Sequence, residues 1–301
     1  MENKASITAL MSSFARAFHF ENEKHPVFAD TLAKKLMTDE EYKTIEKYIL
    51  GGIDFFAPEK KNTFINDTEA VRYIVNSQLA PTPLCRAAYC ERAMKTAAIT
   101  GTEQFVILGA GLDTFALREK EFLQKHIVFE VDHPLTQADK ISRIERADLE
   151  VPRNLKFVGV DFTKDRLSEK LLEAGFDKSK KTFFSWLGVS YYLYLNEIES
   201  LLGELTELGS EGSTLLFDYA DADLFVGDEK RVKNMLAMAK AGGEEMHSCF
   251  DYMSIEKILS DNGFLIFEML MPHDIQSDII DPSGSDIKAF EHINYIQSVL
   301  K

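Results

Sequence analysis

One stretch near the middle of the chain constrains the fold most strongly. Residues 104–108 form a largely apolar run that leads directly into Gly109-Ala110-Gly111, and a second apolar run, residues 127–131, ends at Asp132. Glycines in such a turn let the backbone approach a ligand without a Cβ in the way. An acid at the end of the next strand can accept hydrogen bonds from a ribose. The pattern predicts buried parallel strands with a nucleotide-type cofactor site at their carboxyl ends.

Apolar runs alternate with helix-forming segments from residue 104 onward. We expect strands at 104–108, 127–131, 155–160, 182–187, 213–218, 264–270 and 291–299. Helices are expected at 114–124, 134–147, 164–174, 196–208, 228–241 and 254–261. Strands that are apolar throughout are covered by helices on both faces, and this alternation is typical of a Rossmann-like, doubly wound α/β fold.

The last two predicted strands should break the parallel pattern. Residues 272–288, which join them, are polar and show no helical periodicity. Two strands without a crossover helix pair antiparallel. We therefore expect a mostly parallel sheet with one reversed C-terminal strand.

The first hundred residues are mostly helical by pattern. Predicted helices begin after a cap at Ser6 and at Asp30, span 39–50, and span 84–99 after the break at Pro81-Thr82-Pro83. We expect residues 1–100 to form a helical cap packed on a Rossmann-like domain at 101–301. A helical insert at about 220–262 should help to cover the pocket.

Composition excludes several classes of function. The formal net charge of −15 opposes nucleic acid as a partner. No run approaches 18 apolar residues, so no membrane span is expected. The three cysteines form no CxxC pair, which fits a reducing, cytoplasmic setting. Histidines at metalloprotease spacing are missing, so we expect no metal. The pattern specifies no oligomeric state.

Three loops in register distinguish between cofactors. Thr114 stands where a dinucleotide fingerprint has its third glycine, and the Asp113 carboxylate would face a pyrophosphate. Asp161 and Phe162 follow the third predicted strand, where an acid can accept from an adenine amino group. These features favour S-adenosylmethionine, which is cationic, over NAD. An NAD-dependent oxidoreductase and a non-catalytic cofactor-binding module remain the alternatives.

The same motifs resemble those of a known family, the class I S-adenosylmethionine-dependent methyltransferases of the leucine carboxyl methyltransferase type. The resemblance extends over roughly residues 5–270 and is greatest for a bacterial branch of polyketide-associated O-methyltransferases. Its motifs are Ala15-Arg16-Ala17-Phe18-His19, Pro83-Leu84-Cys85-Arg86, Val106 to Thr114, Phe129 to Pro134, Val160-Asp161-Phe162 and Trp186 to Leu193.

The resemblance implies a role for each matching position. The turn from Gly109 to Gly111 would pass under the methionine part of the cofactor, and Asp132 would hold the ribose. Asp161 and Phe162 would flank the adenine. Arg86 would pair with the cofactor carboxylate, a contact that suits a guanidinium.

One position departs from the family pattern. Much of the family has a glutamate before Gly-Val after the fourth strand, where it meets the amino group of the cofactor. This chain has Leu187 there. The amino group would then rely on backbone carbonyls near Leu108 and Ser185.

The implied reaction is O-methylation of a small-molecule acceptor. Methyl transfer from a sulfonium is an in-line displacement that depends mainly on alignment and on exclusion of water. A carboxylate acceptor needs no base, whereas a hydroxyl acceptor does. The sequence names no catalytic residue, and the candidates are Tyr191, Tyr192, His19, Arg16 and His247. For each of them a structural role in the core or at the surface is the better-supported interpretation.

Overall fold

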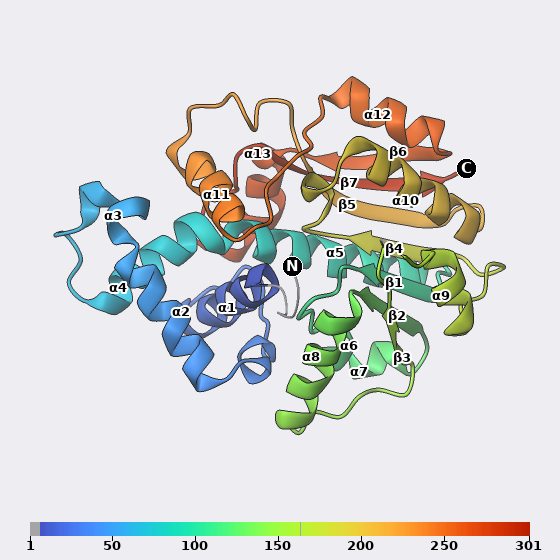
Figure 1. Cartoon of the computed structure of the whole chain (residues 1–301), viewed down its shortest axis with the longest axis horizontal. Coiled ribbons are helices and arrows are strands. Elements are labelled where there is room, and N and C mark those ends of the chain that lie inside the picture. Colours follow the sequence, from blue (N-terminus) through green and yellow to red (C-terminus); the bar gives the residue numbers. More distant parts are fainter. Residues whose placement is uncertain (1–6, 163) are drawn as a thin grey trace.

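The computed structural model describes residues 7–162 and 164–301, and its centre is a seven-stranded sheet in the order β3-β2-β1-β4-β5-β7-β6 (Figure 1). The strands are β1 (Gln104–Leu108), β2 (Ile127–Asp132), β3 (Leu155–Gly159), β4 (Thr182–Trp186), β5 (Thr214–Ala220), β6 (Phe264–Leu270) and β7 (Ile293–Leu300). Each lies within about two residues of its predicted position. The signal is clearest for β1, β4 and β5, which are buried along their whole length, as continuous apolar runs predict.

The sheet is parallel except for one strand. β1 pairs parallel with β2 and β4, and β4 pairs parallel with β5. β7 lies between β5 and β6 and is antiparallel to both. The expected reversed C-terminal strand is therefore confirmed, and the fold is the Rossmann-like α/β sheet that the sequence predicts.

The segment between the last two strands corrects the prediction that 272–288 lacks helix. It contains α13 (Pro272–Ile275), the π-helical turn η5 (Gln276–Ile280) and the 3₁₀ turn η6 (Asp281–Ser283). These turns are too short to show an apolar stripe, so periodicity misses them. They also form no crossover helix, and the reversed pairing is retained.

Alternate residues of β1 enter two separate cores. Phe105 and Ile107 pack in one core with α5 (Pro81–Ile99) and the N-terminal helices. Val106 and Leu108 pack in the other core. Its covering helices are α9 (Leu167–Glu173), α10 (Leu195–Leu208) and α12 (Tyr252–Asp261). The sheet is thus covered on both faces, as a doubly wound fold requires.

Two helices next to β1 and β2 differ from one another in regularity. The predicted helix at 114–124 is divided into α6 (Phe115–Arg118) and α7 (Lys120–Leu123), because the backbone of Glu119 leaves the helical region. α8 (Pro134–Arg146) is continuous and packs on β2 and β3. A buried ion pair joins Lys140 of α8 to Glu130 of β2, and each residue is only 1% exposed.

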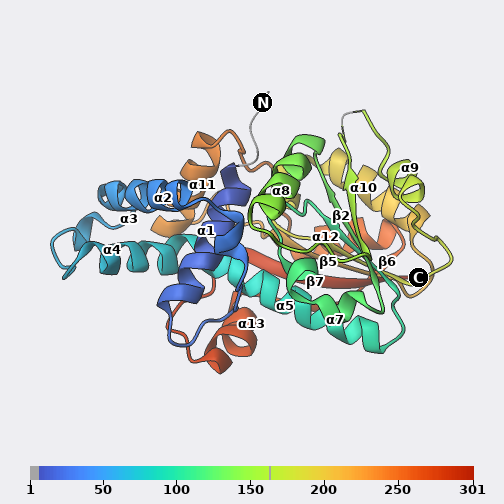
Figure 2. The same ribbon diagram turned by 90° about the horizontal axis from the view of Figure 1, so that it is seen from below.

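The N-terminal helices form a cap beside the sheet (Figure 2). They are α1 (Ile7–Asn22), η1 (Ala33–Leu36), α2 (Asp39–Gly51), α3 (Ile53–Phe56), η2 (Pro58–Lys60), α4 (Asp67–Ile74) and η3 (Val75–Leu79). α5 follows and runs from the cap along the sheet. α11 (Lys230–Ala241) packs against η3 and α3, so part of the predicted insert lies with the cap.

Local sequence signals explain the cap only in part. Thr38 and Glu41 form a capping box at the start of α2, as the predicted helix requires. Asp30 accepts hydrogen bonds from the following backbone but starts only the short turn η1. The break expected at Pro81-Thr82-Pro83 is instead the first turn of α5, where proline loses no helical hydrogen bond. The predicted cap at Ser6 lies outside the described residues.

Candidate cofactor and methyl-transfer site

A cavity of about 550 Å³ opens at the carboxyl ends of β1, β2 and β4. The lining comes from α1 of the cap, one face of α5, the turn after β1, the loops after β2, β3 and β4, and the residues after α11. Ligands of doubly wound folds bind at this edge of the sheet. The volume falls within the range of about 300–1,000 Å³ of small-molecule sites.

The turn after β1 needs both of its glycines. Gly109 and Gly111 have φ angles of +67° and +46°, a region that residues with a Cβ rarely adopt. A Cβ on Gly109 would lie 2.8 Å from the side chain of Val189, and one on Gly111 would lie 3.1 Å from Cβ of Ala9 in α1. The glycines therefore allow both the sharp turn and the close approach of the cap.

Asp132 holds this turn against the end of β2. Its Oδ2 accepts from the Gly111 N–H at 2.6 Å, and its Oδ1 accepts from the His133 N–H at 2.7 Å. Each carboxylate oxygen retains a further acceptor position. Burial raises the pKa of Asp132, against the opposing effect of these two backbone donors. The side chain lines the cavity where a ribose diol would be recognised.

Asp161 and Phe162 differ in their relation to the cavity. Phe162 lines it and is 54% exposed, so its ring is available to a flat ligand. Asp161 is not among the lining residues, and its Oδ2 accepts from Lys164 Nζ at 2.6 Å. Its backbone N–H donates to the Asp165 carboxylate. A role for Asp161 at the adenine would require that it share its carboxylate with Lys164.

Arg86 projects from α5 into the cavity and is held by a buried acid. Its Nη1 donates to the Tyr191 hydroxyl at 3.1 Å and to Asp218 Oδ2 at 3.2 Å. Asp218 Oδ1 accepts from the Gly188 N–H at 2.6 Å. Gly188 has a φ of +75°, and a Cβ there would lie 2.3 Å from Arg86 Nη1. The guanidinium thus requires a glycine after Leu187.

Sequence reasoning missed Asp218. Its side chain is fully buried on β5, and it orients both Arg86 and the loop after β4. The available signal was one acid inside an otherwise apolar strand, Thr214 to Ala220. An unpaired carboxylate is expensive to bury, so such an acid predicts a nearby cation.

The candidate catalytic residues occupy different positions. Tyr192 lines the cavity, and burial raises the pKa of its hydroxyl, so the phenol is neutral. Tyr191 is buried behind it, and its hydroxyl accepts from Arg86. His247 lies at the exposed rim, and its ring stacks on Tyr194 with 4.4 Å between centroids.

His19 lies within the cap and does not line the cavity. Its Nε2 accepts from the Val27 N–H at 3.2 Å. Its Nδ1 lies 3.3 Å from the side-chain oxygen of Asn76, so Nδ1 carries the proton. Burial lowers the pKa of His19. Both ring nitrogens therefore serve the packing of α1 against neighbouring segments.

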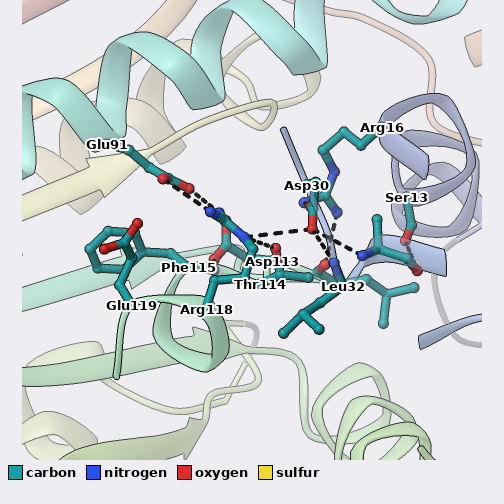
Figure 3. Close-up of polar contacts among 12 residues, drawn as sticks. Ser13, Arg16, Asp30, Leu32, Glu91, Asp113, Thr114, Phe115, Arg118 and Glu119 are labelled. Atoms are coloured by element: carbon teal, nitrogen blue, oxygen red, sulfur yellow. Dashed lines mark hydrogen bonds and ion pairs between the residues drawn. The ribbon is translucent and has the colours of Figure 1, made fainter. Parts of the chain in front are cut away.

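Arg16 links the cap to the cofactor turn (Figure 3). It lines the cavity, and its Nη1 contacts Asp30 Oδ2 at 2.6 Å while its Nη2 donates to the Leu112 carbonyl at 2.8 Å. Asp30 is fully buried and also faces Arg118 at 3.6 Å. The guanidinium of Arg16 is thus occupied by protein contacts, which indicates an anchoring role.

Arg118 extends this chain of charges to α5. Its guanidinium pairs with the Glu91 carboxylate, and its Nε donates to the Thr114 hydroxyl at 2.8 Å. Thr114, which replaces the third glycine of a dinucleotide fingerprint, therefore has a structural partner. Burial raises the pKa of Glu91 to about 7, opposed by Arg118.

The lining of the cavity includes more carboxylates than guanidinium groups. Leu187 itself lines the cavity and offers no charge. Other positions supply the carboxylates: Glu91, Asp113, Asp132, Glu244 and Glu245 all line it. The lining arginines, Arg16 and Arg86, are each paired with a buried aspartate. A cavity of this charge suits a cationic ligand.

Within residues 7–162 and 164–301, no group of three or more His, Cys, Asp or Glu side chains is arranged to hold a metal ion. Over the same ranges, none of the helices combines the length and apolar character that a bilayer crossing demands.

Comparison with known proteins identifies the family. The sequence profile of the leucine carboxyl methyltransferase family matches residues 9–206. The chain is 44% identical over 303 residues to "Putative S-adenosyl-L-methionine-dependent methyltransferase YktD" of Bacillus subtilis (strain 168), covering 100% of this chain and 99% of that protein.

Solved structures agree on the fold. A Thermobifida fusca YX protein, described as "a putative methyltransferase", superposes with a TM-score of 0.60 at 14% identity, over 99% of this chain and 96% of its own. A DUF574 family protein from Streptomyces avermitilis MA-4680 gives a TM-score of 0.57 at 15% identity, over 85% and 96%. With its glycine turn, acidic cavity and cap, the chain belongs to the leucine carboxyl methyltransferase family and is an S-adenosylmethionine-dependent methyltransferase.

Proposed function

We propose that the protein methylates an oxygen atom of a small-molecule acceptor, either a carboxylate or a hydroxyl. The observation that carries the proposal is the 550 Å³ cavity, whose lining includes both α1 of the cap and residues that follow α11. Its walls combine apolar side chains, such as Met94, Ile107 and Val189, with the charged groups described above, and sites for small molecules use apolar walls with placed polar groups in the same way. Such walls exclude water from the reacting atoms.

The proposed cofactor contacts follow the geometry of the turn. Gly109 and Gly111 would pass under the methionine part, and Asp132 would accept from the ribose hydroxyls. Phe162 would lie against the adenine, with Asp161 at its edge. Arg86 would bind the cofactor carboxylate through the guanidinium edge not used by Asp218, because Asp218 and Tyr191 share only its Nη1.

Leu187 carries no negative charge where much of the family has a glutamate, and the carboxylates that line the cavity supply negative charge instead. Asp113 Oδ1 accepts from the Phe115 N–H at 2.8 Å, and its carboxylate lines the cavity together with Glu91. The cofactor carries a sulfonium and an ammonium group, and both are favoured in an acidic cavity. This charge supports S-adenosylmethionine over NAD, whose pyrophosphate it would repel.

S-Adenosylmethionine supplies an activated methyl group, so that an S–C bond breaks as the O–C bond forms and S-adenosylhomocysteine leaves. A carboxylate acceptor needs only alignment, which the Tyr192 hydroxyl can provide as a neutral donor. A hydroxyl acceptor must also lose its proton, and His247, which lines the cavity, would be the residue that receives it. The two acceptor classes therefore depend on different residues.

Calorimetric titration followed by a turnover assay tests the proposal. We expect micromolar binding of S-adenosylmethionine and S-adenosylhomocysteine, about −8 kcal/mol, and none of NAD. Formation of S-adenosylhomocysteine is then measured with panels of carboxylic acids and of phenols. His247→Asn should abolish turnover of phenols and spare that of carboxylic acids.

Three outcomes would redirect the assignment. Binding of NAD without S-adenosylmethionine would indicate an oxidoreductase. Binding of the cofactor without turnover of either panel would favour the non-catalytic module. Methyl transfer to nitrogen or sulfur acceptors alone would contradict O-methylation.

A further inference from the structure

A second cavity, of about 510 Å³, lies apart from the cofactor cavity, and the two share no lining residue. Its walls come from the cap segments η2, α4 and η3, from the first turn of α11 and from residues 286–288 before β7. Figure 1 shows α4 and α11 together on the cap side of the molecule. No step of the proposed reaction uses this cavity.

The second cavity is basic although the chain is acidic. Four cationic side chains line it against two carboxylates, in a chain of net charge −15; they are Lys60, Arg72, Arg231 and Lys288 against Glu69 and Asp286. Among the residues that the structure describes, neither Lys60 nor Lys288 forms an ion pair. The Lys60 ammonium lies 4.7 Å from the centre of the Tyr73 ring. Two ammonium groups that form no ion pair thus belong to the lining of one cavity, together with the carboxylates of Glu69 and Asp286.

The two guanidinium groups are fixed by other contacts. Arg72 donates from Nε and Nη2 to the carboxylate of Glu23, at 2.7 and 2.5 Å, which leaves its Nη1 for a further acceptor. Arg231 forms an ion pair through Nε with the Glu291 carboxylate, packs over the Phe290 ring at 4.5 Å and donates to the Ser77 carbonyl at 3.3 Å. Their charges are therefore held in place before any ligand arrives, which lowers the entropic cost of binding.

The same cavity has an apolar wall and an unusual backbone. The rings of Phe64 and Tyr73 line it, with centroids 5.6 Å apart. The π-helical turn η3 supplies Asn76 and Ser77, and the Ala80 N–H donates to the Val75 carbonyl at 2.8 Å, which closes the wide turn. Single π-helical turns occur frequently at functional sites.

We infer that this cavity is a second ligand site, which binds a small organic anion with a flat apolar body, such as an aryl carboxylate. The anionic group would lie between Lys60, Lys288 and Nη1 of Arg72, and the flat body would lie against Phe64 and Tyr73. The inference goes beyond the proposed methyl transfer, because no residue of the cofactor cavity takes part.

The helix α11 connects the two sites. Arg231 is in its first turn at the second cavity, and residues 243–247, just after its end, line the cofactor cavity. An anion held by Lys60, Lys288 and Arg72 would lie in the cavity that this first turn of α11 lines, and so would bias the position of the loop over the cofactor. A ligand can shift such an equilibrium only by its differential affinity for the two positions.

Calorimetric titration with benzoate tests the inference, with acetate as the probe that lacks the apolar body. Titrations are made on the full chain, with and without saturating S-adenosylhomocysteine. We expect one benzoate site per chain and at least tenfold weaker binding of acetate. Lys288→Glu and Lys60→Glu should each weaken benzoate binding at least tenfold.

A matched substitution separates local charge from net charge. Lys178→Glu makes the same change at an exposed lysine in the loop after α9, which forms no ion pair among the described residues. It should leave benzoate affinity unchanged. Retained binding of S-adenosylhomocysteine by the three variants shows that they are folded, and it is scored apart from benzoate binding.

Two results would overturn the inference. One is the absence of benzoate binding at millimolar concentration. The other is benzoate binding that neither Lys60→Glu nor Lys288→Glu weakens. The second result would place benzoate in the acceptor end of the cofactor cavity, where Tyr192→Phe rather than either lysine variant would change its affinity.

Discussion

Replacement of Asp132 by alanine tests the proposed cofactor geometry directly. Its two carboxylate oxygens each accept one backbone N–H, from Gly111 and from His133, and each has one acceptor position left. Those two positions match the two hydroxyls of a ribose. The substitution removes both ribose contacts and also releases the turn after β1.

The magnitude follows from the number and type of bonds. A hydrogen bond to a charged acceptor contributes about 1.5–3 kcal/mol, and water entering the alanine variant restores part of this to the ribose hydroxyls. We expect a net loss of at least about 1.4 kcal/mol, which is tenfold in Kd. Asp132→Asn should also weaken binding, because its amide nitrogen would face one of the two backbone N–H donors.

The assay is calorimetric titration with S-adenosylhomocysteine and, separately, with adenosine. Both should bind more weakly to Asp132→Ala, because adenosine carries the same ribose. Asp177→Ala is the matched control, since Asp177 also accepts two local hydrogen bonds, from Ser179, but lies away from the cavity. Wild-type affinity of Asp132→Ala for both ligands would refute the assignment of Asp132 to the ribose.

Three further outcomes are expected. Gly188→Ala should lower stability by about 1–3 kcal/mol and weaken S-adenosylhomocysteine binding, because its Cβ would displace Arg86; an unchanged Tm and Kd would contradict this. Lys140→Met should cost about 3–5 kcal/mol in urea unfolding by leaving Glu130 buried and unpaired, and Lys140→Met with Glu130→Leu should recover most of the loss. Burial raises the pKa of Glu91 from 4.5 to about 7, so the folded chain binds this proton more tightly than the unfolded chain does. That stabilisation is complete below pH 4.5 and is lost as the pH rises through 7. Between pH 5.5 and pH 7.5, the urea concentration at the unfolding midpoint should therefore fall more for the wild type than for Glu91→Gln.

The sequence predicts the sheet well because burial on both faces leaves a simple signal. The bounds of β1, which is buried along its whole length, agree with the predicted 104–108, whereas β6 agrees with the predicted 264–270 through its apolar sequence although it is a half-exposed edge strand. Predicted and observed helix bounds agree less well where a single residue interrupts a helix, as Glu119 does between α6 and α7. The turns within 272–288 have no periodic stripe, so only the tertiary structure reveals them.

The site is predictable only where its signal is local. The glycine turn and Asp132 are adjacent to apolar runs, and the structure brings them together. The pairing of Arg86 with Asp218 joins residues 132 positions apart and depends on how α5 crosses the sheet. The sequence alone therefore indicated Arg86 but not the acid that orients it.

The chain of charges from Arg16 through Asp30 and Arg118 to Glu91 has a consequence for protein engineering. Two of its members belong to the cap, one follows the cofactor turn and one is on α5. A chimera that exchanged residues 1–80 with those of a relative would leave Arg118 facing a foreign partner beneath its own cofactor turn. Acceptor specificity is therefore better transplanted by exchanging cavity-lining side chains one at a time than by exchanging the cap as a block.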